Sequence, residues 1–263
     1  MAKKGLLIVS FGTSDSNMRK HAIEKIEKQL AACFLDRVVY CAFTSDVIRE
    51  IIWKKEGVKI LNVQEALGQM VKDGITDVLI QPIFSIEGIE YNKMLMDIQQ
   101  KGSQLTHIFL GKPLLDKRED YIAAVQAVMD EIKSNISFTK HTAVICIGHG
   151  SKYDETERYV QLQKTFQEMG YDMVYVVTIE KSSNFLNTLH KIKQNKYDTV
   201  VLCPFMIVAG SHIKKCMTNT ESNSWKNQLE RQGFEVICIR KGLGELKAIG
   251  RLFCLHAEKA ISE

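Results

Sequence analysis

The sequence predicts an α/β protein with two similar lobes, each a doubly wound parallel sheet covered by helices. Three observations carry this prediction. Apolar runs of strand length alternate with amphipathic stretches of helix length, the alternation occurs twice, and the two halves match in order. The apolar runs are nearly continuous in Val, Ile and Leu, which is typical of parallel strands buried on both faces.

The predicted strands form two sets of four. The first set is 5–11, 38–44, 77–84 and 106–110, and the second is 143–147, 173–179, 199–207 and 235–239. Amphipathic stretches predict helices at 17–32, 62–73, 118–134, 154–169 and 184–195. The polar stretch 134–141 marks the expected boundary, which gives an N-terminal lobe over 1–136 and a C-terminal lobe over 137–263.

The second half reads as a repeat of the first. A shift of 122 positions lays Pro82 on Pro204 and Gly88 on Gly210, and shifts of 137 and 135 align the starts of the halves. Any two α/β segments share some hydrophobic patterning, but the matching Pro and Gly residues favour a duplication. The shifts pair Gly12 with His149, Ser45 with Glu180, and Glu90 with His212.

Composition and charge exclude several classes of protein. With 45% hydrophobic and 25% charged residues, the chain is expected to be globular rather than disordered. A net charge of +4 without a dense Lys/Arg run argues against nucleic acid, although it suits a substrate with several carboxylates. No apolar run approaches the roughly 20 residues of a membrane span. The run GLLIVSF is too short for a signal peptide, so a cytoplasmic protein is expected.

The seven cysteines indicate reduced thiols rather than a metal cluster. None is arranged as C-x-x-C, which argues against a zinc knuckle or an iron–sulfur cluster. An odd number of cysteines, many within apolar runs, fits buried thiols in a reducing compartment.

Three metal-competent side chains follow strands of the second half. In open parallel sheets, ligands bind beyond the carboxyl ends of the strands. His149 follows the strand 143–147, Glu180 ends 173–179, and His212 follows 199–207. Two imidazoles and a carboxylate suit Co, Fe, Ni or Zn rather than Ca or Mg, and an incomplete set leaves positions for a substrate. The alternative is that each residue only caps or hydrogen-bonds at its turn.

Two short turns are candidate substrate-binding segments. FGTS and GHGS each precede a predicted helix, whose N-terminus can hold a carboxylate. Gly148 and Gly150 let the backbone turn sharply around His149 and let a flat ligand approach. The expected substrate-binding residues are Ser10, Phe11, Gly12, Thr13, Gly150 and Ser151. The histidines without this context are His21, His107, His141, His190 and His256, of which His21, His190 and His256 lie in helical stretches and are expected to serve packing or the surface.

The motifs together resemble the anaerobic cobalt chelatases of cobalamin biosynthesis. The resemblance runs from about residue 5 to about residue 256 and rests on GLLIVSFGTSDSN, QPIFSIEGIEYNKM, IGHGS, PFMIVAGSHI, SWK (224–226) and GLGE (242–245). It implies two α/β lobes with a cleft between them, in a fold related to ferrochelatases. It also implies metal ligands at His149, Glu180 and His212, a base at His149, and an acidic cleft residue at Glu90.

Two positions depart from the family pattern. Ile89 and Ser211 stand where the family commonly has an acid, so metal preference and proton routing stay open.

The predicted function is insertion of Co²⁺ into sirohydrochlorin or precorrin-2, with Co²⁺ as substrate and no permanently bound cofactor. A neutral imidazole is suited to accept a ring proton at pH 7. No G-x-x-x-x-G-K-[ST] motif occurs, so ATP is not expected. The expected partners are a tetrapyrrole and a divalent metal ion, with no nucleic acid and no membrane, and a homo-oligomer is left open.

Other functions are compatible with the same residues. A related iron or nickel chelatase or a ferrochelatase would use the same site, and Fe²⁺, Ni²⁺ or Zn²⁺ are alternative metals in vitro. A tetrapyrrole or metal carrier would bind ring and metal without turnover. A periplasmic binding protein shares the two-lobed architecture, but the expected lack of a signal peptide argues against it.

Overall fold

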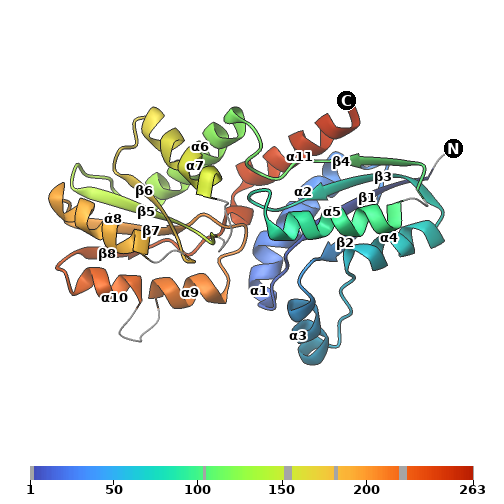
Figure 1. Ribbon diagram of the computed structural model, residues 1–263, viewed down its shortest axis with the longest axis horizontal. Coiled ribbons are helices and arrows are strands. Elements are labelled where there is room, and N and C mark those ends of the chain that lie inside the picture. The colour runs from blue at the N-terminus through green and yellow to red at the C-terminus, as the bar shows by residue number, and fades with distance from the viewer. Residues whose placement is uncertain (1–2, 103–104, 151–155, 181–182, 219–223, 263) are drawn as a thin grey trace. The chain divides into compact units, whose positions relative to one another are not determined.

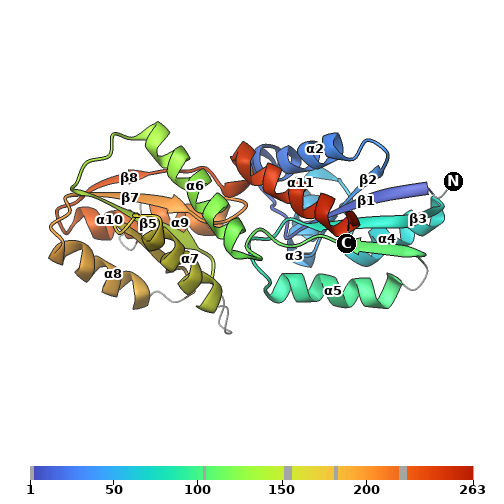
Figure 2. The same cartoon turned by 90° about the horizontal axis from the view of Figure 1, so that it is seen from above.

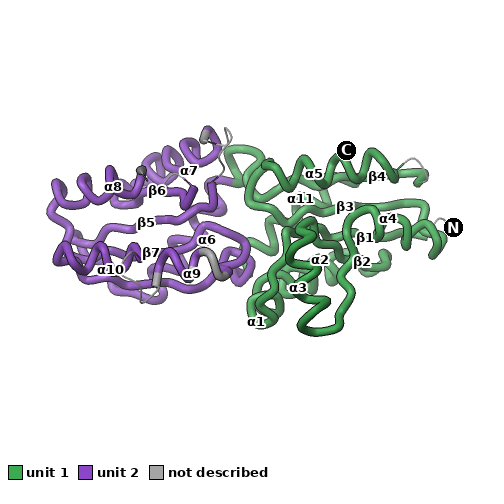
Figure 3. Tube along the Cα trace, turned by 60° about the horizontal axis from the view of Figure 1, so that its bottom comes forward, with its two compact units in different colours: residues 1–120, 247–263 green, residues 121–246 purple. Residues whose placement is uncertain are grey.

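The computed structural model describes residues 3–102, 105–150, 156–180, 183–218 and 224–262. The chain divides into two compact units (Figures 1 and 3). The first unit comprises residues 1–120 and 247–263, and the second comprises 121–246. Each unit contains one four-stranded sheet in which every described pairing is parallel. This confirms the predicted fold class.

The sheet of the first unit has the order β2-β1-β3-β4. Its strands are β1 (Lys3–Ser10), β2 (Val38–Phe43), β3 (Ile75–Pro82) and β4 (His107–Leu110). Its helices are α1 (Ser16–Met18), the π-helix η1 (Arg19–Ile23), α2 (Glu24–Cys33), α3 (Asp46–Glu56), α4 (Val63–Lys72), α5 (Ile89–Lys101) and α11 (Lys247–Ser262). The apolar faces of α4 and α5 pack on β1 and β3 around Leu67, Met70 and Met94, which are fully buried.

The sheet of the second unit repeats this order as β6-β5-β7-β8. Its strands are β5 (Thr142–Gly148), β6 (Val174–Thr178), β7 (Thr199–Pro204) and β8 (Glu235–Cys238). Its helices are α6 (Arg118–Asn135), α7 (Thr156–Glu168), α8 (Ser183–Gln194), α9 (Ser211–Thr218), α10 (Trp225–Glu230) and the 3₁₀ helix η3 (Leu243–Glu245), and the start of α6, up to Asp120, belongs to the first unit. The core beneath α8, α9 and α10 includes Phe185 stacked on Trp225, with ring centroids 4.5 Å apart. None of the described helices is long and apolar enough to cross a membrane.

The units in space differ from the lobes 1–136 and 137–263 expected from the sequence, because α6 opens the second unit and α11 returns to the first. α11 packs on α2, β3 and β4, and Figure 2 shows it beside α2. Its residues Ile249, Phe253 and His256 are buried, and His256 Nε2 lies 3.0 Å from Asp120 Oδ1. A boundary drawn between contiguous segments misses such a return, because it depends on contacts between residues far apart in the chain.

The internal repeat holds in atomic detail. Ser10 pairs with Phe43 as Gly148 pairs with Thr178, and Val9 pairs with Pro82 as Ile147 pairs with Pro204. Equivalent strands therefore carry the same register in both units.

One predicted equivalence is wrong by a single position. Ser45 N donates to Phe11 O at 3.4 Å, and Glu180 N donates to His149 O at 3.2 Å. The counterpart of His149 is therefore Phe11 rather than Gly12. Gly12 corresponds to Gly150, and both have left-handed backbones with φ of 93° and 74°. Apolar and glycine patterns alone fit either alignment of these turns, whereas the backbone hydrogen bonds allow only one.

Candidate functional site

Two of the predicted metal ligands lie together at the carboxyl edge of the second sheet. His149 directly follows β5, Glu180 follows β6 by two residues, and the bond from Glu180 N to His149 O joins their backbones. Both residues are exposed. His149 Nδ1 lies 3.0 Å from Gly150 O, and a carbonyl only accepts, so Nδ1 carries the proton. The Nε2 lone pair is then the one that can bind a metal or take up a proton.

The third predicted ligand is located by its backbone. His212 is the second residue of α9, which follows β7 after a short connection, so it belongs to the same edge of the sheet. Its side chain lies outside the described residues, as does the whole of Ser151. Among the side chains that are described, no group of three His, Cys, Asp or Glu could hold a metal ion. The three-ligand site therefore stays a prediction.

The turn that carries His149 depends on glycine at position 150. Its φ of 74° lies in the left-handed region, and an added Cβ would lie 2.6 Å from Cβ of Thr178. The backbone thus passes close to the end of β6 immediately after His149, which agrees with the sharp turn expected from the sequence.

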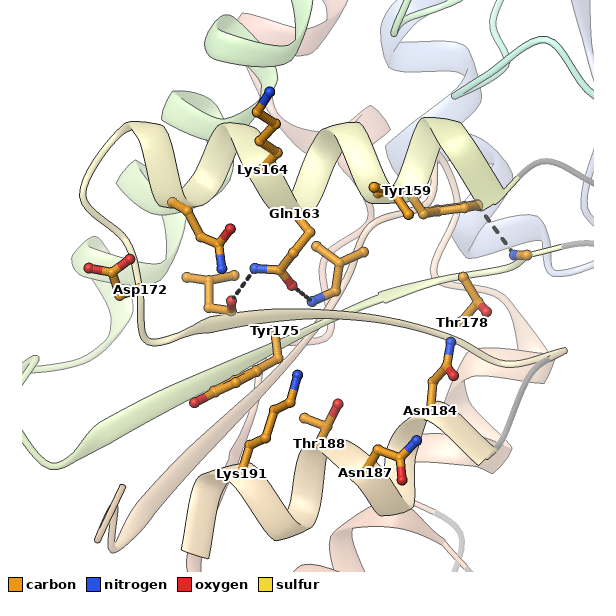
Figure 4. A pocket seen from close by; sticks show the side chains of 15 residues that line it. Tyr159, Gln163, Lys164, Asp172, Tyr175, Thr178, Asn184, Asn187, Thr188 and Lys191 are labelled. Atoms are coloured by element: carbon orange, nitrogen blue, oxygen red, sulfur yellow. Dashed lines mark hydrogen bonds between the residues drawn. The ribbon is translucent and has the colours of Figure 1, made fainter. Parts of the chain in front are cut away.

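A groove of about 550 Å³ runs along the outer edge of β6, between α7 and α8 (Figure 4). It reaches Gly150 and Thr178 at one end, near the predicted ligands His149 and Glu180 in the sequence. Gln163 spans the strand edge: its Nε2 donates to Val174 O at 2.8 Å, and its Oε1 accepts from Val176 N at 2.7 Å. Further polar lining comes from Asn184, Asn187, Thr188 and Lys191 on α8.

The sequence analysis did not identify this groove. The available signal was the spacing of Asn184, Asn187 and Lys191, which recurs at intervals of a helix face. A polar stripe next to an edge strand indicates a solvated surface as readily as a binding site, so the spacing alone does not decide.

The first unit presents a different set of groups at the equivalent edge. Phe11 is 46% exposed, an unusual state for a large aromatic residue at a strand end. Gly12 faces the Phe43 ring, where an added Cβ would lie 2.4 Å from Cδ2. Thr13 Oγ1 accepts from Asp15 N at 3.3 Å and so holds the turn before α1. Within the described part of the chain, Ser10 Oγ is buried without a hydrogen-bond partner.

Glu90 is the second residue of α5, and Gly88 is the N-cap. Its Oε2 is buried, and no described group donates a hydrogen bond to it. The carboxylate is therefore not the capping group of this helix, although the N-terminal end of the helix dipole favours its charge. Lys93, one turn further on, donates to Thr44 O at 2.6 Å and pairs with Asp46 at 3.1 Å.

Two of the thiols, Cys146 and Cys216, are packed side chains with a raised pKa. All seven cysteines are free. A hydrogen bond with Cys203 and burial raise the pKa of Cys146, and burial raises the pKa of Cys216 to about 11. Such thiols are poor metal ligands, because the thiolate is the coordinating form.

Comparison with known proteins finds matches along the whole chain. The family model "Cobalt chelatase (CbiK)" matches residues 4–262. The sirohydrochlorin cobaltochelatase of Salmonella typhimurium is 30% identical over 260 residues, covering 99% of this chain and 97% of the relative. The sirohydrochlorin cobaltochelatase CbiKC of Nitratidesulfovibrio vulgaris is 25% identical over 264 residues, covering 100% of this chain and 92% of the relative.

Solved structures show the same fold at lower identity. SirB from Bacillus subtilis with Fe³⁺ superposes with a TM-score of 0.72 at 16% identity, covering 98% of this chain and 95% of SirB. CbiX, described as the terminal enzyme of siroheme biosynthesis in denitrifying bacteria, gives 0.61 at 12% identity, covering 97% and 99%. With the family model matching from residue 4 to residue 262, the chain belongs to the CbiK family of cobalt chelatases.

Proposed function

We propose that this protein is a sirohydrochlorin cobaltochelatase, which inserts Co²⁺ into the tetrapyrrole ring. The observation that carries the proposal is the bond from Glu180 N to His149 O, which brings a carboxylate-bearing and an imidazole-bearing residue to one sheet edge. It occurs in a chain that belongs to the cobalt chelatase family and is 30% identical to a sirohydrochlorin cobaltochelatase.

Cobalt binding is assigned to His149, Glu180 and His212. Two imidazole nitrogens and a carboxylate oxygen are suitable ligands for Co²⁺, and three protein ligands leave coordination positions for the ring nitrogens. The metal is a substrate, so the ligands must hold it less strongly than the ring does. Exposure of both His149 and Glu180 is compatible with this transfer.

Proton removal is assigned to His149 and Glu90. Entry of Co²⁺ releases the two N–H protons of the free ring, so charge is balanced only when bases accept them. His149 Nε2 becomes available when a ring nitrogen replaces it on the metal, and an imidazole is a suitable base near pH 7. Glu90 accepts the other proton, which fits a carboxylate oxygen that the described residues leave without a donor.

Ring binding is assigned to the two turns and to the groove. Ser10, Phe11, Gly12 and Thr13 in the first unit and Gly150 and Ser151 in the second are the proposed contacts, with the exposed Phe11 ring available for stacking. The groove beside β6 offers amide, hydroxyl and ammonium donors, which suit the peripheral carboxylates of the ring. Seven free thiols suit a cytoplasmic enzyme.

The test is the change in absorbance when sirohydrochlorin is mixed with Co²⁺ and the protein. The wild-type chain should accelerate the spectral change of metal insertion, whereas His149→Ala should not. His190→Ala, at an exposed position of α8, is the matched control and should behave as wild type. Parallel reactions with Fe²⁺, Ni²⁺ and Zn²⁺ identify the preferred metal. Ring binding without acceleration by any of these metals would contradict the proposal and favour a carrier.

A further inference from the structure

We infer that Tyr159 is a positioning residue that holds the turn around His149 in the shape required to bind cobalt. The inference rests on the proposed function, since it concerns the same metal site. Tyr159 lies in the first turns of α7, ten residues after His149. It also forms the upper wall of the groove beside β6 (Figure 4).

The first observation is a hydrogen bond that follows His149 directly. Gly150 N donates to the Tyr159 hydroxyl oxygen at 3.3 Å, which Figure 4 shows as a dashed line. This N–H belongs to the peptide unit between His149 and Gly150. The carbonyl of the same peptide unit accepts from Glu180 N at 3.2 Å. This one peptide group therefore makes two hydrogen bonds: its N–H donates to the Tyr159 hydroxyl, and its carbonyl accepts from the backbone N–H of Glu180.

The second observation is a close contact before His149. A Cβ added to Gly148 would lie 2.3 Å from Cε1 and 2.8 Å from Cζ of the Tyr159 ring. Gly148 is not among the glycines with positive φ, so its backbone does not itself require glycine. The Tyr159 ring is the reason that this position cannot carry a side chain.

The two contacts lie on either side of His149 along the chain. The ring of Tyr159 lies against the residue before His149, and its hydroxyl binds the residue after it. The His149 side chain in turn places Nδ1 3.0 Å from Gly150 O, which fixes the tautomer. Orientation of an imidazole by its surroundings is a large part of metal affinity, and loss of such supporting contacts typically costs about 10- to 100-fold.

The first unit has no glycine at the position that corresponds to Gly148. Ser10, which pairs with Phe43 as Gly148 pairs with Thr178, carries a side chain that is 4% exposed. The second unit, which carries His149, thus has a glycine that leaves room for an aromatic ring, whereas the first unit has a serine at this position.

The test compares Tyr159→Phe with Tyr175→Phe. Tyr175 lines the same groove, and its hydroxyl accepts a hydrogen bond from Asn195 Nδ2 at 3.2 Å and also contacts Tyr197, so it serves as a control tyrosine away from His149. Co²⁺ alone is titrated into each variant, and affinity and the d–d absorption of bound cobalt are recorded with the melting temperature. Tyr159→Phe should bind Co²⁺ about threefold to tenfold more weakly, as expected from loss of the hydrogen bond that Gly150 N donates, with altered d–d bands. Tyr175→Phe should match wild type, and both melting temperatures should stay close to the wild-type value.

A double-substitution cycle tests the ring contact independently. Gly148→Ala alone should weaken Co²⁺ binding by more than about tenfold, because the new methyl group displaces the Tyr159 ring. In a Tyr159→Ala background the same Gly148→Ala change should add less than about twofold, since the obstructing ring is gone.

Three outcomes would overturn the inference. Wild-type affinity and spectrum in Tyr159→Phe would show that the hydroxyl does not shape the site. Equal losses in Tyr159→Phe and Tyr175→Phe would indicate a general effect of the groove. Failure of the wild-type chain to bind Co²⁺ would overturn the proposed function as well, whereas the first two outcomes leave that function intact.

Discussion

The two units are built on the same backbone plan and differ in the side chains placed on it. Their sheets have the same strand order, and the strands that meet at the carboxyl edge have the same register. The turn after the first strand of each unit accepts the same backbone hydrogen bond, at Phe11 O in the first and at His149 O in the second. Because the scaffolds are equivalent, a difference in chemistry between the units has to come from individual residues.

Three equivalent positions carry that difference. The second unit has His149, Glu180 and His212 where the first has Phe11, Ser45 and Glu90. Ser45 is committed to structure, since its Oγ accepts from Ile48 N at 3.3 Å and caps α3. The second unit can thus supply a nitrogen–nitrogen–oxygen ligand set, whereas the first supplies an exposed aromatic ring and a carboxylate.

The first unit also leaves buried polar atoms without partners. Ser10 Oγ, Thr44 Oγ1 and Glu90 Oε2 are each buried with no hydrogen-bond partner in the described structure. Thr44 N donates to Ser10 O at 2.9 Å, and the Lys93 ammonium group of α5 donates to Thr44 O. Unsatisfied groups are costly and are often explained by function or by bound water. Their position favours a role in ring and proton handling for this unit.

The largest expected effect separates proton handling from metal binding. Glu90→Gln should lower turnover about 10²- to 10⁴-fold while leaving Co²⁺ affinity nearly unchanged, because a positioned acid–base group typically contributes that much. Steady-state rates with sirohydrochlorin and Co²⁺, together with calorimetric titration of Co²⁺, measure both quantities. Glu87→Gln is the control, since Glu87 precedes the same helix and lies 3.9 Å from Lys112. Wild-type turnover in Glu90→Gln would remove this residue from the mechanism.

The second prediction tests whether α11 stabilises the first unit. His256 and Asp120 form a buried pair with side chains that are 7% and 6% exposed. His256→Ala should destabilise the protein by about 3 kcal/mol, because Asp120 Oδ1 is left buried without its hydrogen-bond donor, while Oδ2 still accepts from Lys117 N at 2.9 Å. Denaturant unfolding gives the free energy, and amide hydrogen exchange shows where protection is lost.

The pattern of amide exchange distinguishes the two units of the structure from the lobes 1–136 and 137–263 expected from the sequence. Loss of protection concentrated in β3, β4 and α2 is the expected result. Loss confined to residues 137–246 would contradict the assignment of α11 to the first unit. Joint replacement of His256 and Asp120 by leucine should recover part of the stability, since no charge is then left buried.

The third prediction compares equivalent positions directly. His149→Ala, Glu180→Ala and His212→Ala should each weaken Co²⁺ binding by about 100-fold. Loss of a ligand should cost at least as much affinity as loss of a contact that only orients a ligand. Phe11→Ala and Ser45→Ala, at the matching positions of the first unit, should leave Co²⁺ affinity unchanged. Calorimetric titration measures all five variants, with His190→Ala as a surface control. Unchanged affinity in the Glu180 variant would exclude it from the ligand set.

Much of the fold was predictable because it rests on local patterns. Each strand is a short apolar run, and burial on both faces makes such runs continuous, so β1, β3, β5 and β7 stand out in the sequence. The rule that ligands bind beyond the carboxyl ends of strands then selected His149 and His212 from the seven histidines as candidate ligands.

The remaining features depend on contacts that no local pattern encodes. The equivalence of Phe11 with His149 is decided by backbone hydrogen bonds between neighbouring strands. The return of α11 to the first unit depends on packing between residues more than 200 positions apart, such as Gln29 and Lys247. The role inferred for Tyr159 depends on its ring lying against Gly148, and the sequence shows only a tyrosine on a helix.

The smallest expected effect concerns the groove of the second unit. Figure 4 shows Lys191 extending from α8 toward β6 beside Thr188, whereas Lys164 extends outward from α7, where it lies 3.8 Å from Glu168. Both lysines line the groove, but Lys164 is paired with Glu168, so a peripheral carboxylate of the ring that enters the groove is expected to pair with Lys191. Lys191→Ala should therefore raise the KM for sirohydrochlorin about twofold to fivefold, the range of a solvent-exposed ion pair, and leave kcat unchanged. Lys164→Ala removes the same charge from the same rim and should leave KM unchanged at physiological salt. Equal increases in both variants would mean that net charge steers the substrate without a specific contact. No increase in either variant would place the peripheral carboxylates outside this groove.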